Sequence, residues 1–170
     1  LIDDRVIIPG LKKIDGYTGI RRLFSQVFEV IPGSLDPAAK APANYFEFAY
    51  DWRRHNAVSA CKLKVFIDER LPIWRTHTGA ANAKVVLLAH SMGGLVARHY
   101  LDVLDGWRDC RALISFGTPY RGSVDALNYL CNGYKMLFIE LTEIMRTFSS
   151  VYELLPIYPV IEAGGSYHRV

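Results

Sequence analysis

The chain has 170 residues, of which 51% are apolar and 22% are charged, and its formal net charge is +3. These proportions supply a buried core for one domain and exclude intrinsic disorder as the main state. The basic residues are scattered without interleaved aromatic residues, so we expect no binding to nucleic acid. The longest aliphatic run, Val85–Ala89, is far shorter than the roughly 20 residues of a membrane-spanning helix. We therefore expect no transmembrane segment.

The cysteines and histidines show no spacing typical of metal ligands. Three cysteines, Cys61, Cys110 and Cys131, are widely separated and odd in number, which fits neither a zinc site nor a disulfide framework. The histidines are His55, His77, His90, His99 and His168. We expect no metal and no cofactor, and the cysteine pattern favours a reduced, intracellular chain.

The first half of the chain predicts two strands and a long helix. A short apolar run at Arg5–Ile8 ends at Pro9-Gly10 and is typical of a strand followed by a turn. The aromatic segment Asn44–Tyr50 predicts a second strand. Apolar residues recur at helical spacing over Ala57–Thr78, where Pro72 is expected to kink or split the helix.

The middle of the chain predicts a strand–helix–strand unit. Lys84–Ala89 is continuously β-branched and aliphatic, which indicates a strand in a parallel sheet covered by helices on both faces. Met92–Leu104 has helical spacing, and Arg111–Phe116 is a second apolar strand. This alternation predicts an α/β fold with a mainly parallel sheet.

Helical stretches follow this unit. We predict helices over Ser123–Cys131 and Lys135–Phe148, and a last helix that opens with a capping box, Ser150-x-x-Glu153. The apolar residues of this region are consistent with a plain core.

The sequence Ala89-His90-Ser91-Met92-Gly93-Gly94 joins the buried strand to the following helix. It departs from the nucleophile motif G-x-S-x-G only at Ala89, which is small enough for the same sharp turn. Such a turn would expose the Ser91 hydroxyl at a helix N-terminus, and the Met92 backbone N–H would be an oxyanion donor. We predict Ser91 as a nucleophile; the alternative makes it a helix N-cap. His90 would point away from its neighbour on so sharp a turn.

Four sequence blocks together resemble the lecithin:cholesterol acyltransferase family of α/β-hydrolases. They are Tyr50-Asp51-Trp52-Arg53, the serine motif, Ile114–Pro119 with Gly122-Ser123, and Leu154-Leu155-Pro156. The resemblance extends from Ile7 to Tyr158. It implies a three-layer α/β-hydrolase fold over residues 1–170 as a single partial domain, with the start of a helical cap at about 123–165. Asp51, Trp52 and Arg53 are expected to form a buried support with a paired charge rather than to take part in the chemistry.

The same resemblance implies chemistry through an acyl-serine intermediate. The expected substrate is a lipid or other acyl ester, with transfer to water or to an alcohol. Two alternatives stay open: a catalytically inactive binding module that keeps the fold, and an esterase or thioesterase without lipid preference. The sequence does not indicate an oligomeric state.

A serine nucleophile requires a general base and an orienting carboxylate, which follow it in α/β-hydrolases. His99 lies on the same helix as the serine, so Asp125 and His168 are the formal candidates within the chain. The family places its acid and base farther downstream, and no segment can be assigned as the second oxyanion donor. Together with the start at Leu1, these gaps predict an internal portion of a larger hydrolase.

Overall fold

A computed structural model describes residues 5–8, 12–14, 17–133, 135–136, 139–140 and 142–170. The chain divides into two compact units. Unit 1 comprises Leu1–Ala49 and Asp68–Ala83, and unit 2 comprises Tyr50–Ile67 and Lys84–Val170. The long helix α2 (Asn56–Thr78) contributes residues to both. The single partial domain with a cap-like region stays a prediction.

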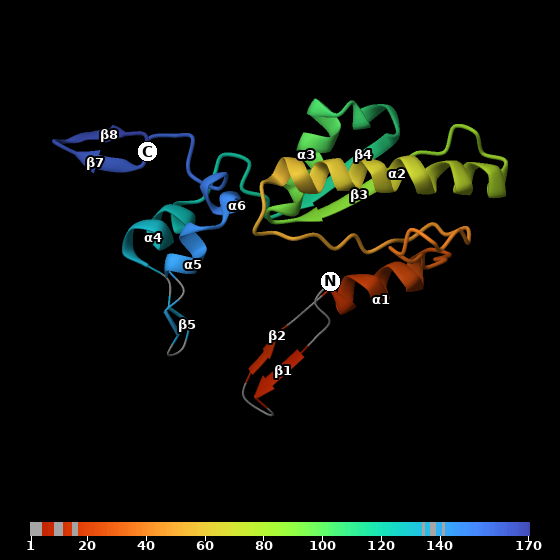
Figure 1. Ribbon diagram of the computed structural model, residues 1–170, viewed down its shortest axis with the longest axis horizontal. Helices are drawn as coiled ribbons and strands as arrows, with labels where there is room; N and C mark the ends of the chain where they lie inside the picture. The colour runs from red at the N-terminus through yellow and green to blue at the C-terminus, as the bar shows by residue number, and fades with distance from the viewer. Residues whose placement is uncertain (1–4, 9–11, 15–16, 134, 137–138, 141) are drawn as a thin grey trace. The chain divides into compact units, whose positions relative to one another are not determined.

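Unit 1 begins with a small hairpin. Strand β1 (Arg5–Ile8), found where the sequence predicts it, pairs antiparallel with β2 (Lys12–Ile14) (Figure 1). The predicted turn at Pro9-Gly10 lies outside the described residues. Helix α1 (Thr18–Val27) follows and was not predicted.

The predicted strand at Asn44–Tyr50 is wrong. Its backbone makes one isolated parallel bridge, Pro32 to Tyr45, in which Gly33 N–H donates to the Tyr45 carbonyl at 2.8 Å. A strand needs a continued ladder of such bonds. After Tyr45 no ladder continues in the described residues, so the segment is an irregular connection despite its β-prone composition.

Side-chain bonds hold this irregular part of unit 1. The Arg21 guanidinium binds the Glu47 carboxylate through two bonds of 2.5 and 2.8 Å. Arg70, which is buried, donates to the backbone carbonyls of Asp36 and Ala39. Backbone carbonyls without a ladder partner are thus satisfied by a side chain.

Helix α2 confirms the prediction of a helix over Ala57–Thr78 but is not split at Pro72, which lies inside it. Proline removes one helical hydrogen bond, that to the Asp68 carbonyl. Tertiary contacts compensate, since Leu63, Ile67 and Leu71 along this helix are buried.

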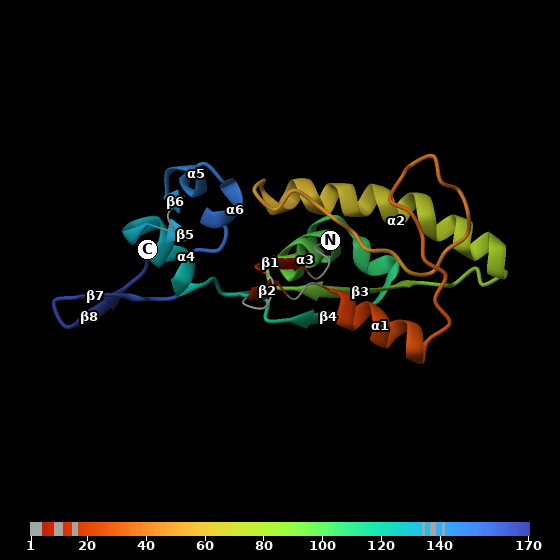
Figure 2. The same ribbon diagram turned by 90° about the horizontal axis from the view of Figure 1, so that it is seen from below.

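Unit 2 is built on the predicted strand–helix–strand sequence. Strand β3 (Val85–His90) pairs in parallel with β4 (Cys110–Phe116), and α3 (Gly93–Val103) connects them by way of a 3-10 turn at Gly106–Arg108. Figures 1 and 2 show α3 beside the two strands. The core of α3 includes Val96, Ala97 and Tyr100, all at most 3% exposed. The molecule is therefore mixed α/β with a two-stranded parallel sheet.

The sheet is covered less than its composition predicts. One face carries Val86, Leu88, Ile114 and Phe116, whose exposed fractions are 39–51%. The expectation of helices on both faces is thus wrong for this face. The apolar composition of the two strands predicts that both of their faces are buried, but this face is partly exposed.

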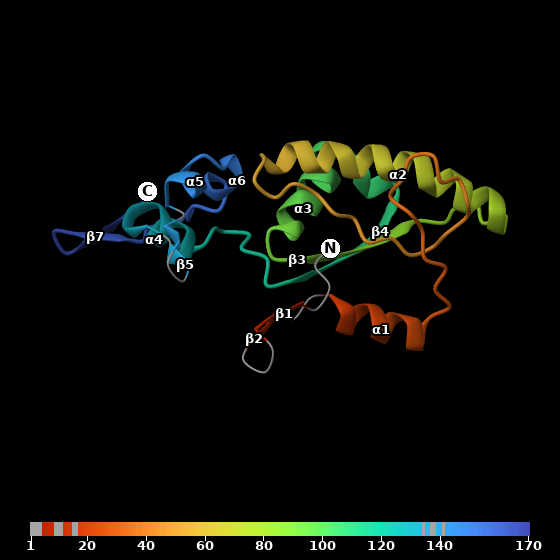
Figure 3. The same ribbon diagram turned by 60° about the horizontal axis from the view of Figure 1, so that its bottom comes forward.

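The region after β4 mixes short helices and hairpins (Figure 3). In chain order it contains α4 (Val124–Asn132), β5 (Lys135–Met136), β6 (Ile139–Glu140), α5 (Thr142–Arg146), α6 (Ser149–Tyr152), β7 (Ile161–Ala163) and β8 (Ser166–His168). The helix predicted over Ser123–Cys131 is confirmed. No helix in the described ranges has the length and apolar character needed to cross a bilayer.

Two predictions fail in this region. The helix expected over Lys135–Phe148 begins only at Thr142, because β5 pairs antiparallel with β6 and the Glu140 carboxylate then accepts the Thr142 N–H. The capping box is also wrong: Glu153 binds the Asn56 N–H at 2.7 Å, while the Ser150 hydroxyl is buried without a hydrogen-bond partner. The Glu153 carboxylate therefore caps α2, which lies 97 residues earlier in the chain.

Candidate active site at the end of strand β3

Ser91 lies in the turn between β3 and α3, and its backbone is left-handed with φ of 52°. Among the described residues, Asp105 is the other non-glycine residue with positive φ. This conformation costs an L-amino acid about 1–2 kcal/mol, so surrounding contacts must hold it. Ser91 N–H donates to the Phe116 carbonyl at 2.8 Å, and the Ser91 carbonyl accepts the Gly94 N–H at 3.0 Å. The side chain is exposed.

The two glycines after Met92 have different surroundings. A Cβ built on Gly94 would lie 2.7 Å from Thr118 Cβ, which is closer than real side chains approach. A Cβ on Gly93 would meet only the Tyr50 hydroxyl at 3.6 Å and Ala89 Cβ at 4.0 Å, both ordinary contacts. The close crossing that demands a glycine is therefore at Gly94, where the chain after β4 passes α3.

Met92 occupies the N-cap position of α3 and is 9% exposed. Its carbonyl accepts the N–H groups of Leu95 and Val96. Its own N–H donates to no group in the part of the chain that the structure describes. A free N–H at a helix N-terminus beside an exposed hydroxyl is suited to an oxyanion.

The formal acid and base, Asp125 and His168, are both exposed. Asp125 is in the first turn of α4, and His168 is in β8, where it pairs with Ile161. Within the described ranges, no hydrogen bond or ion pair joins Ser91 to Asp125, His168 or His99. His90 is exposed at the end of β3.

The Tyr50–Arg53 block contains the expected charge pair. Arg53 binds Asp51 through Nε–Oδ1 and Nη2–Oδ2 bonds of 2.7 and 2.9 Å. The hydrogen bond from the Arg53 side chain lowers the pKa of Asp51 to about 2. The pair is not the buried support that we expected, because Arg53 and Trp52 are both exposed.

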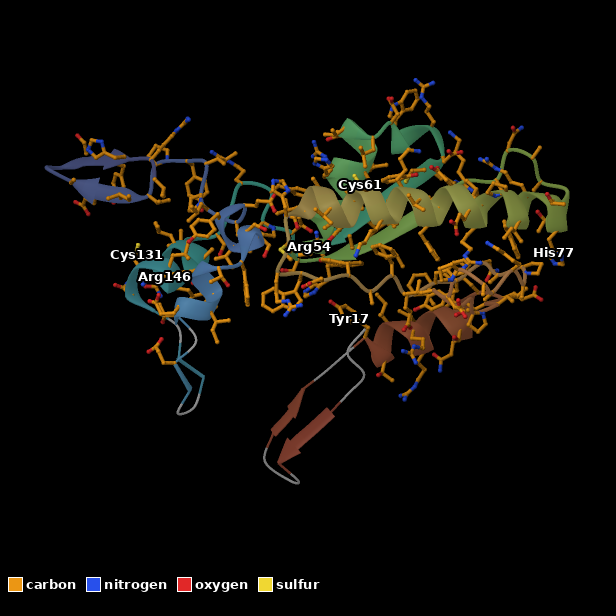
Figure 4. The ribbon with its side chains drawn as sticks, in the orientation of Figure 1. Tyr17, Arg54, Cys61, His77, Cys131 and Arg146 are labelled. Atoms are coloured by element: carbon orange, nitrogen blue, oxygen red, sulfur yellow. The ribbon has the colours of Figure 1, made fainter. Side chains whose placement is uncertain are left out.

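A cleft of about 420 Å³ lies beside this block and was missed by sequence reasoning. One wall is the segment 51–58, which includes Arg53, Arg54 and His55, and the other wall is residues 147–149. Figure 4 shows Arg54 at the start of α2. The basic triplet Arg53-Arg54-His55 was the one sequence feature that could have indicated this cleft. Nothing in the sequence shows that residues 147–149, almost 100 residues away, form the other wall.

The remaining candidates add no metal centre. The three cysteines are free, with Cys61 and Cys131 exposed, and burial raises the pKa of the Cys110 thiol. No cluster of three or more potential metal ligands occurs among the described residues.

A left-handed serine between a parallel strand and a helix has the geometry of the nucleophile elbow found in α/β-hydrolases. The family model described as lecithin:cholesterol acyltransferase matches residues 19–166. The chain therefore belongs to the lecithin:cholesterol acyltransferase family, which confirms the resemblance stated from the four sequence blocks. The family implies an α/β-hydrolase fold and indicates an acyltransferase or hydrolase with lipid substrates. No curated protein matches the chain significantly.

Proposed function

We propose that the chain carries the nucleophile of a serine-dependent hydrolase or O-acyltransferase acting on lipid-like esters. The observation that supports this most is the strained, exposed Ser91 with the free Met92 N–H next to it. Strain of this kind is retained where it serves a site, and here it presents a hydroxyl in front of a helix N-terminus.

In the proposed reaction, Ser91 Oγ forms a bond to the ester carbonyl carbon while its proton passes to a general base. The carbonyl oxygen becomes an oxyanion that accepts the Met92 N–H. Collapse of this intermediate breaks the ester bond, and the leaving alcohol takes the proton from the base. Water or a second alcohol then attacks the acyl-serine and restores the Ser91 hydroxyl.

The described contacts do not identify the general base. His168 with Asp125 is the formal pair inside the chain, and each would have to approach Ser91 from its present position on β8 or α4. A residue beyond this chain is the alternative that the family pattern favours. The cap-like region 123–165 would form the acyl pocket in either case.

The first test is labelling of the full chain with a fluorophosphonate probe, read by peptide mass spectrometry. We expect an adduct on Ser91 of the wild type and no adduct in the Ser91→Ala variant. The Ser115→Ala variant should carry the same Ser91 adduct as the wild type. Ser115 is the matched control because it is an exposed serine on the neighbouring strand β4. Absence of the adduct in the folded full-length protein would favour the inactive binding module.

A second test concerns lipid preference. The proposal expects faster hydrolysis of a long-chain than of a short-chain nitrophenyl ester, because a long acyl chain buries more apolar surface. Equal rates would favour the esterase or thioesterase without lipid preference. Added glycerol or a sterol as acceptor would distinguish acyl transfer from hydrolysis by the ester formed.

A further inference from the structure

The cleft between residues 51–58 and 147–149 has a net positive lining. Its ionised side chains are those of Asp51, Arg53 and Arg54. Asp51 and Arg53 neutralise each other through their two-bond pair. The Arg54 N–H donates to the Asp51 carbonyl at 3.3 Å, but the Arg54 side chain forms no hydrogen bond or ion pair with any described residue, so its guanidinium is left to face the cleft as an unpaired cation.

His55 and the opposite wall add polar groups. His55 Nδ1 lies 3.0 Å from the Glu153 carboxylate, which fixes the ring at the start of α2. Thr147 and Ser149 bring hydroxyl groups from the other side, and both residues are exposed. The Thr147 hydroxyl donates its proton to the Ile144 carbonyl at 2.6 Å, so it is not a donor for a ligand. The Ser149 hydroxyl forms no hydrogen bond with any described residue and can donate to one.

An aromatic pair borders the same cleft. Phe148 packs edge-on against Trp52, with ring centroids 5.3 Å apart and an interplanar angle of 89°. This contact and the bond from Ser150 N–H to the Arg53 carbonyl at 3.5 Å join the two walls within unit 2. The cleft is therefore formed by contacts in the fold, although its walls are far apart in sequence.

We propose that this cleft binds a phosphate group, either as the free anion or as the phosphate ester of a lipid headgroup, with Arg54 as its main contact. A guanidinium offers two parallel donors that match two phosphate oxygens, and Ser149 can donate to a third oxygen. A volume of about 420 Å³ accommodates a phosphate ester together with part of the group it carries. The proposal does not require Ser91 to be catalytic.

The test is calorimetric titration of the full chain with inorganic phosphate. We expect Arg54→Gln to weaken binding at least about tenfold, the loss typical of a charged hydrogen-bonding group. Arg111→Gln removes the same charge from an exposed site on β4 and should leave the affinity unchanged. Asp51→Asn should tighten binding, because it removes the competing carboxylate and frees the Arg53 guanidinium.

A vesicle arm distinguishes the two sources of phosphate. Binding to phosphatidic acid in phosphatidylcholine vesicles that is lost in Arg54→Gln and displaced by inorganic phosphate identifies a lipid headgroup. Phosphate binding without Arg54-dependent vesicle binding identifies the free anion. Equal phosphate affinity in the wild type and Arg54→Gln, or no heat from a folded wild type at millimolar phosphate, overturns the proposal. The Ser91→Ala variant should bind phosphate normally, so failure of the nucleophile and failure of the cleft remain separable.

Discussion

The adjacent glycines at the start of α3 give a sharp test of the elbow, because the same substitution should have opposite effects at the two positions. Replacing a helical glycine by alanine gains up to about 1 kcal/mol from helix propensity. Neither glycine has a positive φ, so alanine suits the backbone at both. At Gly93 the new methyl group would make ordinary contacts, whereas at Gly94 it would collide with the Thr118 side chain.

We therefore expect Gly93→Ala to be neutral or stabilising. Overpacking costs about 1–3 kcal/mol, so Gly94→Ala should be less stable than Gly93→Ala by about that amount. For a chain of this size the difference corresponds to roughly 2–12 °C in melting temperature. Urea unfolding followed by far-UV circular dichroism measures it, provided that both variants show the same denaturant dependence.

The partner of the collision provides a further check. Thr118→Ala removes Oγ1 and Cγ2, so it should recover part of the stability lost in Gly94→Ala and almost none in Gly93→Ala. Double-mutant cycles isolate that coupling. Equal stability of the two single variants, or no coupling between Gly94 and Thr118, would refute the packing that we assign to the elbow.

Two further predictions follow from charged contacts in unit 2. Glu153→Ala should lower the free energy of unfolding by about 1 kcal/mol, because it removes the carboxylate that caps α2 at Asn56. Glu153→Gln should retain much of that stability. Thermal unfolding of both variants measures the difference. In Arg53→Gln the pKa of Asp51 should rise from about 2 towards 3.8, measured by NMR titration of the carboxyl carbon. Because the pKa of Asp51 is lowered in the folded protein, the stabilising effect of the pair is present above pH 3.8 and is lost as the pH falls through 2. An Asp51 pKa near 2 in the Arg53→Gln variant would contradict the pairing.

The strand–helix–strand part of unit 2 was predictable because its signals are local. β3 and β4 are continuous apolar runs, and α3 has helical spacing and begins at two glycines. The position of Ser91 in a sharp turn follows from these neighbours. Its left-handed backbone is consistent with the same motif, whose small residues allow the turn.

The errors arise where distant contacts override local preference. Asn44–Tyr50 has the composition of a strand but forms only one bridge, and Glu153 leaves its own helix to cap α2. Helix α1 could have been found, since Ile20, Leu23, Phe24 and Val27 recur at helical spacing, although Gly19 weakens the pattern. The cleft between residues 51–58 and 147–149 could not be predicted, because its two walls meet only in the folded chain.

The elbow itself also depends on segments that lie apart in the sequence. The cost of the left-handed Ser91 is offset by its bond to the Phe116 carbonyl and by the crossing of Thr118 over Gly94. Tyr50 reaches the same helix start beside Gly93, and the next residue, Asp51, is the first of the segment 51–58 that lines the cleft. Three of the four blocks that marked the family therefore converge on one turn. We infer that the residues around Tyr50 and Thr118 hold the serine in place, so substitutions there should alter the conformation of the turn without changing its sequence.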